Sequence, residues 1–186
     1  CTRTTVFGAP NNEQIQYFTA VLKAHIDCAM QPFPKGTTGI ALDGITRSSM
    51  WRQGYTFQHG TGHGVGAGLN VHEGPIGIHK RSQHAMAPGH ITSIEPGYYR
   101  ADWGGIRHEN LYVVRDTEKT SDPDGTPLYN FESLTWVPYD MRIVDANALS
   151  VEQGQWLEHY HTQVIEKLSP HLSDEEMAWV KNITDN

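Results

Sequence analysis

Glycine occupies every second position in one short segment of this chain, and this pattern constrains the fold more than any other feature. Five glycines lie within nine residues, from Gly60 to Gly68, and they surround His63. Without Cβ atoms, such a backbone can approach an ion or a substrate closely. His72 lies nine positions after His63, too far for a pair one helical turn apart, so we expect a bend with one histidine on each arm. The two imidazoles would then converge on one cavity, although the segment alone also fits a glycine-rich turn with incidental surface histidines.

Charge and cysteine content exclude several classes of protein. The 186 residues include 14 Lys and Arg against 21 Asp and Glu, a net charge of −7. This balance lacks the positive charge that drives nucleic-acid binding, so no nucleic-acid partner is expected. No apolar run approaches the roughly 20 residues of a membrane span, so no membrane partner is expected. Cys1 and Cys28 form no closely spaced pair, which argues against a disulfide framework or a thiolate zinc site. We expect a soluble and, by default, cytoplasmic protein.

Hydrophobic periodicity and turn residues divide the chain into helical and β-rich parts. Apolar residues at steps of three or four predict helices over residues 13–30 and 38–53. Two capping-box patterns, which begin at Ser150 and Ser173, predict two more helices near the end of the chain. Short β-rich runs predict an antiparallel sheet from residues 55–57, 67–72, 90–95, 106–115 and 134–144, and residues 1–7 are also strand-like. Residues 116–127 are predicted to form an exposed hairpin loop.

Two glutamates stand among apolar neighbours. Glu95 closes a β-rich run and is followed by Pro-Gly, and Glu109 lies between apolar strand residues. A carboxylate directed toward a sheet face among such neighbours is costly unless it is paired or binds a cation. The alternative is a salt bridge from either glutamate to Arg107 or Arg100. Imidazole and carboxylate groups together suit a catalytic zinc, manganese or cobalt site.

The residues in these motifs resemble a known family. The segment His59-Gly-Thr-Gly-His63 and its continuation to residue 75, the segment Ser93-Ile-Glu-Pro-Gly-Tyr-Tyr99 and the segment Gly105-Ile-Arg-His-Glu-Asn110 resemble, in order, three signature segments of the Xaa-Pro aminopeptidases. Residues 2–5 and 134–138 are also similar. The resemblance implies an α+β pita-bread fold, an antiparallel sheet with flanking helices, that is incomplete at its N-terminus. It further implies that residues 1–145 are the C-terminal portion of the catalytic domain. Residues 146–186 would be a helical extension packed on that domain, as in the long, three-domain, homodimeric form.

The resemblance also implies a role for each residue in these motifs. His63 and Glu95 would bind one metal ion, and Glu109 would bridge two divalent ions, manganese first, with zinc or cobalt as alternatives. His72 would contact the substrate carbonyl, and Glu95 would relay a proton. His59 would line the substrate pocket. Arg107 would orient Glu109 without binding metal. The intact enzyme would release the N-terminal residue from peptides with proline in second position, using a metal-bridging hydroxide.

This sequence departs from the family pattern at two aspartate ligands. In the family, the second of these immediately precedes the strand that matches residues 2–5, so it would fall before Cys1. Asp27, Asp43 and Asp102 lie in other segments. We therefore expect a fragment that is inactive by itself. Prolidase, methionine aminopeptidase and a non-catalytic pita-bread binding module remain alternatives. The other histidines are assigned surface or packing roles: His25, His79, His84, His90, His108, His159, His161 and His171.

Overall fold

The computed structural model describes residues 1–68, 70–121 and 123–185, and its secondary structure is α+β, as predicted. The helices are α1 Asn12–Ala29, α2 Gly39–Trp51, α3 Val151–Leu168 and α4 Asp174–Thr184, with short 3-10 turns η1 Met141–Ile143, η2 Ala146–Ala148 and η3 Ser169–His171. The strands are β1 Phe33–Pro34, β2 Gly62–His63, β3 Gly77–Ile78, β4 Ile91–Ile94, β5 Gly97–Arg100, β6 Gly104–Arg107, β7 Asn110–Thr120 and β8 Pro127–Ser133.

The helices begin where local sequence signals place them. Asn11, Ser150 and Ser173 each cap a helix through a reciprocal capping box, before α1, α3 and α4 respectively. These side chains satisfy backbone N–H groups that the first helical turn leaves without partners. Helix α2 follows Thr38, and Gly54 adopts the positive φ of 79° in the turn after this helix. No helix in the described part of the chain has the length and apolar character needed to cross a membrane.

The main sheet has four antiparallel strands in the order β1-β8-β7-β4, and β2-β3 and β5-β6 form separate hairpins. The hairpin predicted at residues 116–127 is present, but its strands extend further than expected. Strand β7 continues to Thr120 and β8 begins at Pro127, and position 122 of the predicted loop lies outside the described residues.

Three predicted strands are corrected by the structure. Residues 55–57 and 134–144 form no strand, and some of their backbone groups bond to side chains instead. Arg47 donates to the carbonyl of Phe57, and Tyr160 accepts from the N–H of Val137. Residues 67–72 contain no strand among those described, and position 69 lies outside them. The strand-like opening makes one isolated bridge, from Thr2 to Glu109.

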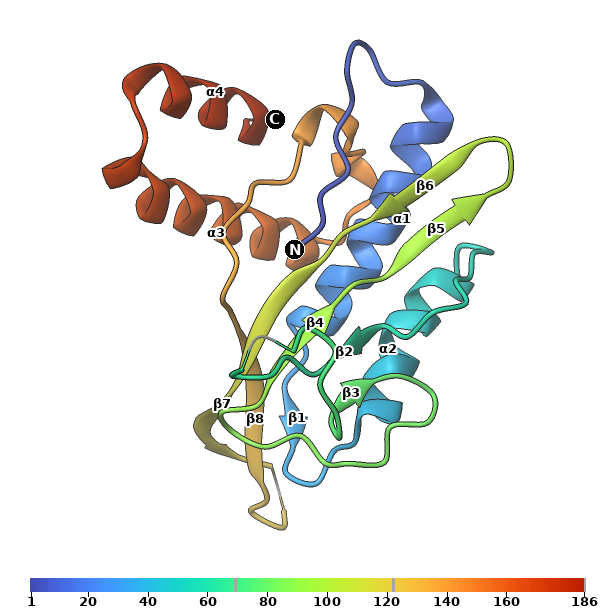
Figure 1. Cartoon of the computed structure of the whole chain (residues 1–186), viewed down its shortest axis with the longest axis vertical. Helices are drawn as coiled ribbons and strands as arrows, with labels where there is room; N and C mark the ends of the chain where they lie inside the picture. Colours follow the sequence, from blue (N-terminus) through green and yellow to red (C-terminus); the bar gives the residue numbers. More distant parts are fainter. Residues whose placement is uncertain (69, 122, 186) are drawn as a thin grey trace.

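Helix α1 lies at the centre of the molecule and contributes to both hydrophobic clusters. Figure 1 shows α2 on one side of α1 and the α3–α4 pair on the other. One cluster joins α1 to the C-terminal helices through residues that include Phe18, Leu157 and Val164. The other packs the end of α1 against α2 and the four-stranded sheet, with Leu42 and Tyr112 fully buried. Buried apolar contacts therefore fix α3 and α4 to the same body as the sheet.

Candidate metal centre

Two carboxylates face each other across an interruption in one long β-ribbon. Strands β4 and β7 pair up to Ile94 opposite Asn110, and β5 and β6 resume the same register with Gly97 opposite Arg107. Counting inward from both ends places Glu95 opposite Glu109. Like charges directly opposite each other on neighbouring strands destabilise a sheet, so this position calls for a cation between them.

His63 reaches the same point from β2. One ligand atom from each of His63, Glu95 and Glu109 lies within 4.8 Å of the others, and all three residues are half-buried. Ligand atoms held about 2.1 Å from one ion can be at most about 4.2 Å apart, so the three side chains are close to the spacing of a metal site. The sequence-predicted ligands are thus brought together by three separate strand ends.

The tautomer of His63 suits metal binding. Its Nδ1 lies 2.9 Å from the carbonyl oxygen of Gly64, which can only accept, so the neutral ring carries its proton on Nδ1. Nε2 then presents a lone pair, 3.3 Å from Oε1 of Glu95. The Ser93 hydroxyl accepts from the His63 backbone N–H at 3.0 Å and lies 3.2 Å from the same Glu95 oxygen. A hydrogen-bonded second nitrogen is the usual way in which proteins orient a metal-binding imidazole.

This segment needs glycine because a Cβ atom would clash with neighbouring backbone at two of its positions. A Cβ on Gly62 would overlap the carbonyl oxygen of Ser93, and one on Gly64 would overlap that of Glu73. Strand β2 can therefore lie against β4 only with glycine at position 62, and residue 64 can lie against Glu73 only as glycine. The close approach is what places His63 beside Glu95.

His72 lies next to His63 without joining the cluster of His63, Glu95 and Glu109. Its ring centroid is 4.3 Å from that of His63, at an interplanar angle of 72°, and the side chain is exposed. The predicted convergence of these two histidines is therefore seen in the structure. From this place His72 can reach a molecule that contacts the ligand cluster from the solvent side.

His59 and Arg107 meet at the hydroxyl of Tyr99. His59 Nδ1 lies 2.8 Å from the carbonyl of Gly60, so its Nε2 accepts from the Tyr99 hydroxyl, also at 2.8 Å. Arg107 Nε donates to that hydroxyl at 2.8 Å. Burial lowers the pKa of His59 and so favours its neutral form.

Arg107 contacts Glu95, the salt bridge left open as an alternative, and not Glu109, which the resemblance implied it would orient. Its Nη1 lies 3.5 Å from Oε2 of Glu95, whereas Glu109 receives a hydrogen bond from the hydroxyl of Thr2. The long distance and the exposed guanidinium make this a weak ion pair. The alternative partner, Arg100, binds Glu13. Salt bridges therefore leave the facing carboxylates only partly compensated.

Sequence reasoning did not find three residues that hold the site: Thr2, Ser93 and Tyr99. Ser93 stands two positions before Glu95, so strand alternation could have placed both on one face. No comparable signal marks Thr2, because its partner Glu109 is 107 positions away. Asp43 is not a spare ligand, since one of its oxygens accepts from Thr61 and the other from Arg47.

Comparison with known proteins decides the family. Residues 1–116 match the model of metallopeptidase family M24, and residues 127–186 match the C-terminal region of peptidase_M24. The chain belongs to metallopeptidase family M24. Its fold is the pita-bread fold, as shown by a TM-score of 0.89 to an X-prolyl aminopeptidase from Caenorhabditis elegans, described as a cytosolic enzyme with a di-nuclear active site. That match has 39% identity and covers 98% of this chain and 30% of the other.

Other M24 relatives agree with this assignment. A probable Xaa-Pro aminopeptidase P from Fusarium vanettenii is 44% identical over 98% of this chain, and one from Pyricularia oryzae has the same identity and coverage. Prolidase from Pyrococcus furiosus is 35% identical, with a TM-score of 0.55, over 60% of this chain and 32% of its own. The chain spans about 30% of the length of the curated relatives it matches.

Proposed function

We propose that the full-length protein containing this chain is a Xaa-Pro aminopeptidase, which removes the N-terminal residue from peptides with proline in second position. The observation that carries this proposal is the convergence of His63, Glu95 and Glu109 within 4.8 Å in an M24 chain. Similarity over 98% of the chain to Xaa-Pro and X-prolyl aminopeptidases supports this specificity. The Pyrococcus furiosus prolidase is less similar in structure, with a TM-score of 0.55 against 0.89 for the C. elegans X-prolyl aminopeptidase.

The donor set fits a pair of divalent ions. His63 Nε2 and Glu95 would hold one ion, and Glu109, opposite Glu95, has a second oxygen with which to share another. When bound, two such ions supply a water of lowered pKa and polarise the substrate carbonyl. One imidazole and two carboxylates, with no thiolate, suit manganese, and zinc or cobalt would also accept these ligands. The remaining ligands must come from outside these three residues.

The other site residues would act on the substrate. His72, exposed beside His63, can donate a hydrogen bond to negative charge that develops on the substrate oxygen. Glu95 can take a proton at a carboxylate oxygen and pass it to the leaving nitrogen of proline. His59 would line the substrate pocket, where Tyr99 holds its ring. Arg107 would steady Glu95 and Tyr99 without binding the ions.

The organisation of the full-length protein is proposed from the same relatives. Residues 1–145 would complete the pita-bread catalytic domain, and residues 146–186 would be its helical extension. We propose a cytoplasmic location, since the C. elegans relative is described as cytosolic, and a homodimer from the resemblance to the long, three-domain form. The net charge of −7 gives no reason to expect a nucleic-acid partner.

Substrate choice tests this function. The purified, manganese-loaded full-length protein is assayed on a tripeptide with proline second, on an Xaa-Pro dipeptide, and on a tripeptide with N-terminal Met and no proline. Release of the first residue from the proline tripeptide, well above the other two, is expected. Preference for the dipeptide would identify a prolidase, and preference for the Met peptide a methionine aminopeptidase. Hydrolysis of none of them, with metal bound or not, would favour a binding module.

A further inference from the structure

Arg3 connects several segments at Glu109 and Asn110, where strand β7 begins. Its Nη1 donates to the carbonyl of Glu109 at 2.8 Å, and its Nη2 donates to Oδ1 of Asn110 at 2.6 Å. Its guanidinium also lies 4.0 Å from the ring centroid of Tyr139. Among the described residues no carboxylate forms an ion pair with Arg3. Its donors are used to hold backbone and side-chain oxygens in place.

Helix α3 holds the other side of this guanidinium. Nη2 of Arg3 donates to the hydroxyl of Tyr160 at 2.9 Å, and Tyr160 also accepts from the N–H of Val137 at 3.2 Å. The Tyr160 hydroxyl can donate in turn to the carbonyl of Val137 at 2.9 Å. The donor hydrogen and both acceptor lone pairs of this hydroxyl are therefore used.

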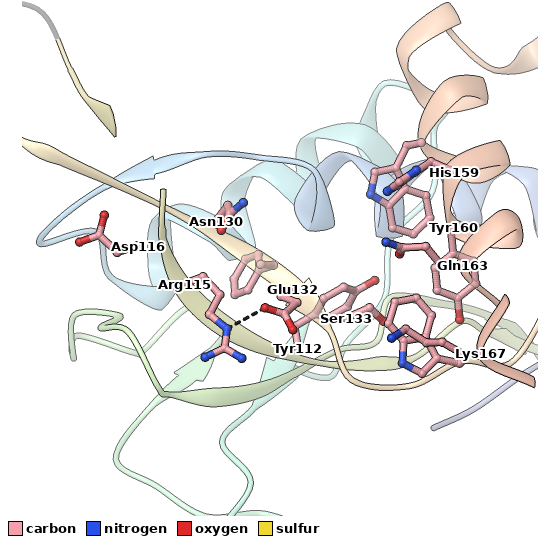
Figure 2. A pocket seen from close by; sticks show the side chains of 13 residues that line it. Tyr112, Arg115, Asp116, Asn130, Glu132, Ser133, His159, Tyr160, Gln163 and Lys167 are labelled. Carbon is pink, nitrogen blue, oxygen red and sulfur yellow. Dashed lines mark hydrogen bonds and ion pairs between the residues drawn. The ribbon is translucent and has the colours of Figure 1, made fainter. Parts of the chain in front are cut away.

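Stacking fixes the ring of Tyr160 independently of its hydroxyl. The ring is 5.3 Å from Trp156, nearly parallel at 4°, and 5.7 Å from Trp136 at 22°. All three rings line a groove of about 590 Å³ between α3 and strands β7 and β8, and Figure 2 shows Tyr160 on the α3 side of it. Removing the hydroxyl alone would leave this stacking in place, so the polar contact can be tested separately from the packing.

Thr2 fixes both the backbone and the side chain of Glu109. Thr2 exchanges two backbone hydrogen bonds with Glu109, and its hydroxyl bonds the Glu109 carboxylate. Arg3, the next residue, connects this backbone to α3. A shift of Arg3 would therefore move both the main chain of Glu109 and the short segment that orients its carboxylate.

We propose that Tyr160 and Arg3 are positioning residues through which α3 sets the place of the metal ligand Glu109. The C-terminal region would then support the metal centre itself, although none of its residues reaches the ligand cluster. This inference rests on the proposed function in one respect only, the role of Glu109 as a metal ligand. Partners that orient metal ligands typically change affinity or activity 10- to 100-fold when they are removed.

Metal affinity is the direct readout. Metal-free full-length protein is titrated with Mn²⁺ by calorimetry, and thermal unfolding of each metal-free variant is recorded. Tyr160→Phe and Arg3→Lys are each expected to weaken the binding of manganese about tenfold. Their effects should not add in the double variant, because both break the same connection. The matched control is Val164→Ala, a fully buried position on the same helix whose contacts are apolar. It should lower the unfolding temperature and leave the affinity unchanged.

The outcomes separate this inference from the proposed function. Unchanged affinity in both Tyr160→Phe and Arg3→Lys would overturn the inference, and so would an equal loss in Val164→Ala, which would reduce the effect to general destabilisation. If Tyr160→Phe does not fold, Arg3→Lys alone decides. Failure of the unmodified protein to bind manganese or to cleave the proline tripeptide would instead count against the proposed function.

Discussion

Replacing Asp43 by alanine should destabilise the chain far more than breaking an ion pair on the surface. The Asp43 side chain is buried, with Oδ2 2.7 Å from Nε of Arg47 and Oδ1 accepting from the hydroxyl of Thr61 at 2.7 Å. The variant would leave a largely buried guanidinium without its carboxylate and a buried hydroxyl without its acceptor. Removing one partner of a buried pair costs about 3–5 kcal/mol.

Urea unfolding followed by tryptophan fluorescence measures this loss. With a dependence on denaturant of about 2 kcal/mol per molar urea, the midpoint should fall by about 1.5–2.5 M. Glu132→Ala is the control, because the Arg115–Glu132 pair is equally short at 2.7 Å but about half exposed on both sides (Figure 2). Exposed pairs contribute about 0–1 kcal/mol, so its midpoint should move by less than about 0.5 M. Equal shifts in the two variants would refute the reasoning that burial, not distance, sets the contribution of these pairs.

Three further results are expected. In the full-length protein, His72→Ala should lower turnover on the order of a hundredfold with metal content retained, whereas His63→Ala should lower both; equal metal loss would make His72 a ligand. Gly62→Ala should disrupt the approach of β2 to β4, while Gly68→Ala, whose added Cβ meets nothing within 4 Å, should not; metal content and unfolding temperature compare the two. Burial, together with the charge of a nearby arginine, lowers the pKa of His161 to about 4, so the fold favours its neutral form. The contribution of neutral His161 to the free energy of unfolding should be complete above about pH 6.5 and be lost toward pH 4, by up to about 3 kcal/mol. Urea midpoints of the unmodified chain and of His161→Gln, compared across this pH range, measure the loss.

The helices could be predicted because their signals are local. The capping boxes at Asn11, Ser150 and Ser173 lie within a few residues of the helices they begin, and apolar spacing marks each buried face. Strands depend on partners that the sequence does not name. Residues 134–144 have strand-like composition but exchange hydrogen bonds with Tyr160 of α3 and accept one from Arg3. Strand β8 was not predicted, and all of it except Pro127 follows the segment interpreted as a loop.

The candidate site shows the same division. The resemblance of the motifs identified His63, Glu95 and Glu109 as candidate ligands. The two carboxylates converge because the β4–β7 and β5–β6 pairs share one register, which places Glu95 opposite Glu109. No periodicity within one strand gives that pairing. The residues that hold the ligands were missed for the same reason, since Arg3 lies 106 positions from Glu109 and 157 from Tyr160.

Anomalous diffraction from crystals of the manganese-loaded full-length protein tests the central claim most directly. The account predicts two anomalous peaks about 3.5–4 Å apart, one beside His63 Nε2 and Glu95, and both beside the carboxylate of Glu109. Peaks that lie away from these three side chains, or none at a manganese concentration that supports hydrolysis, would contradict it.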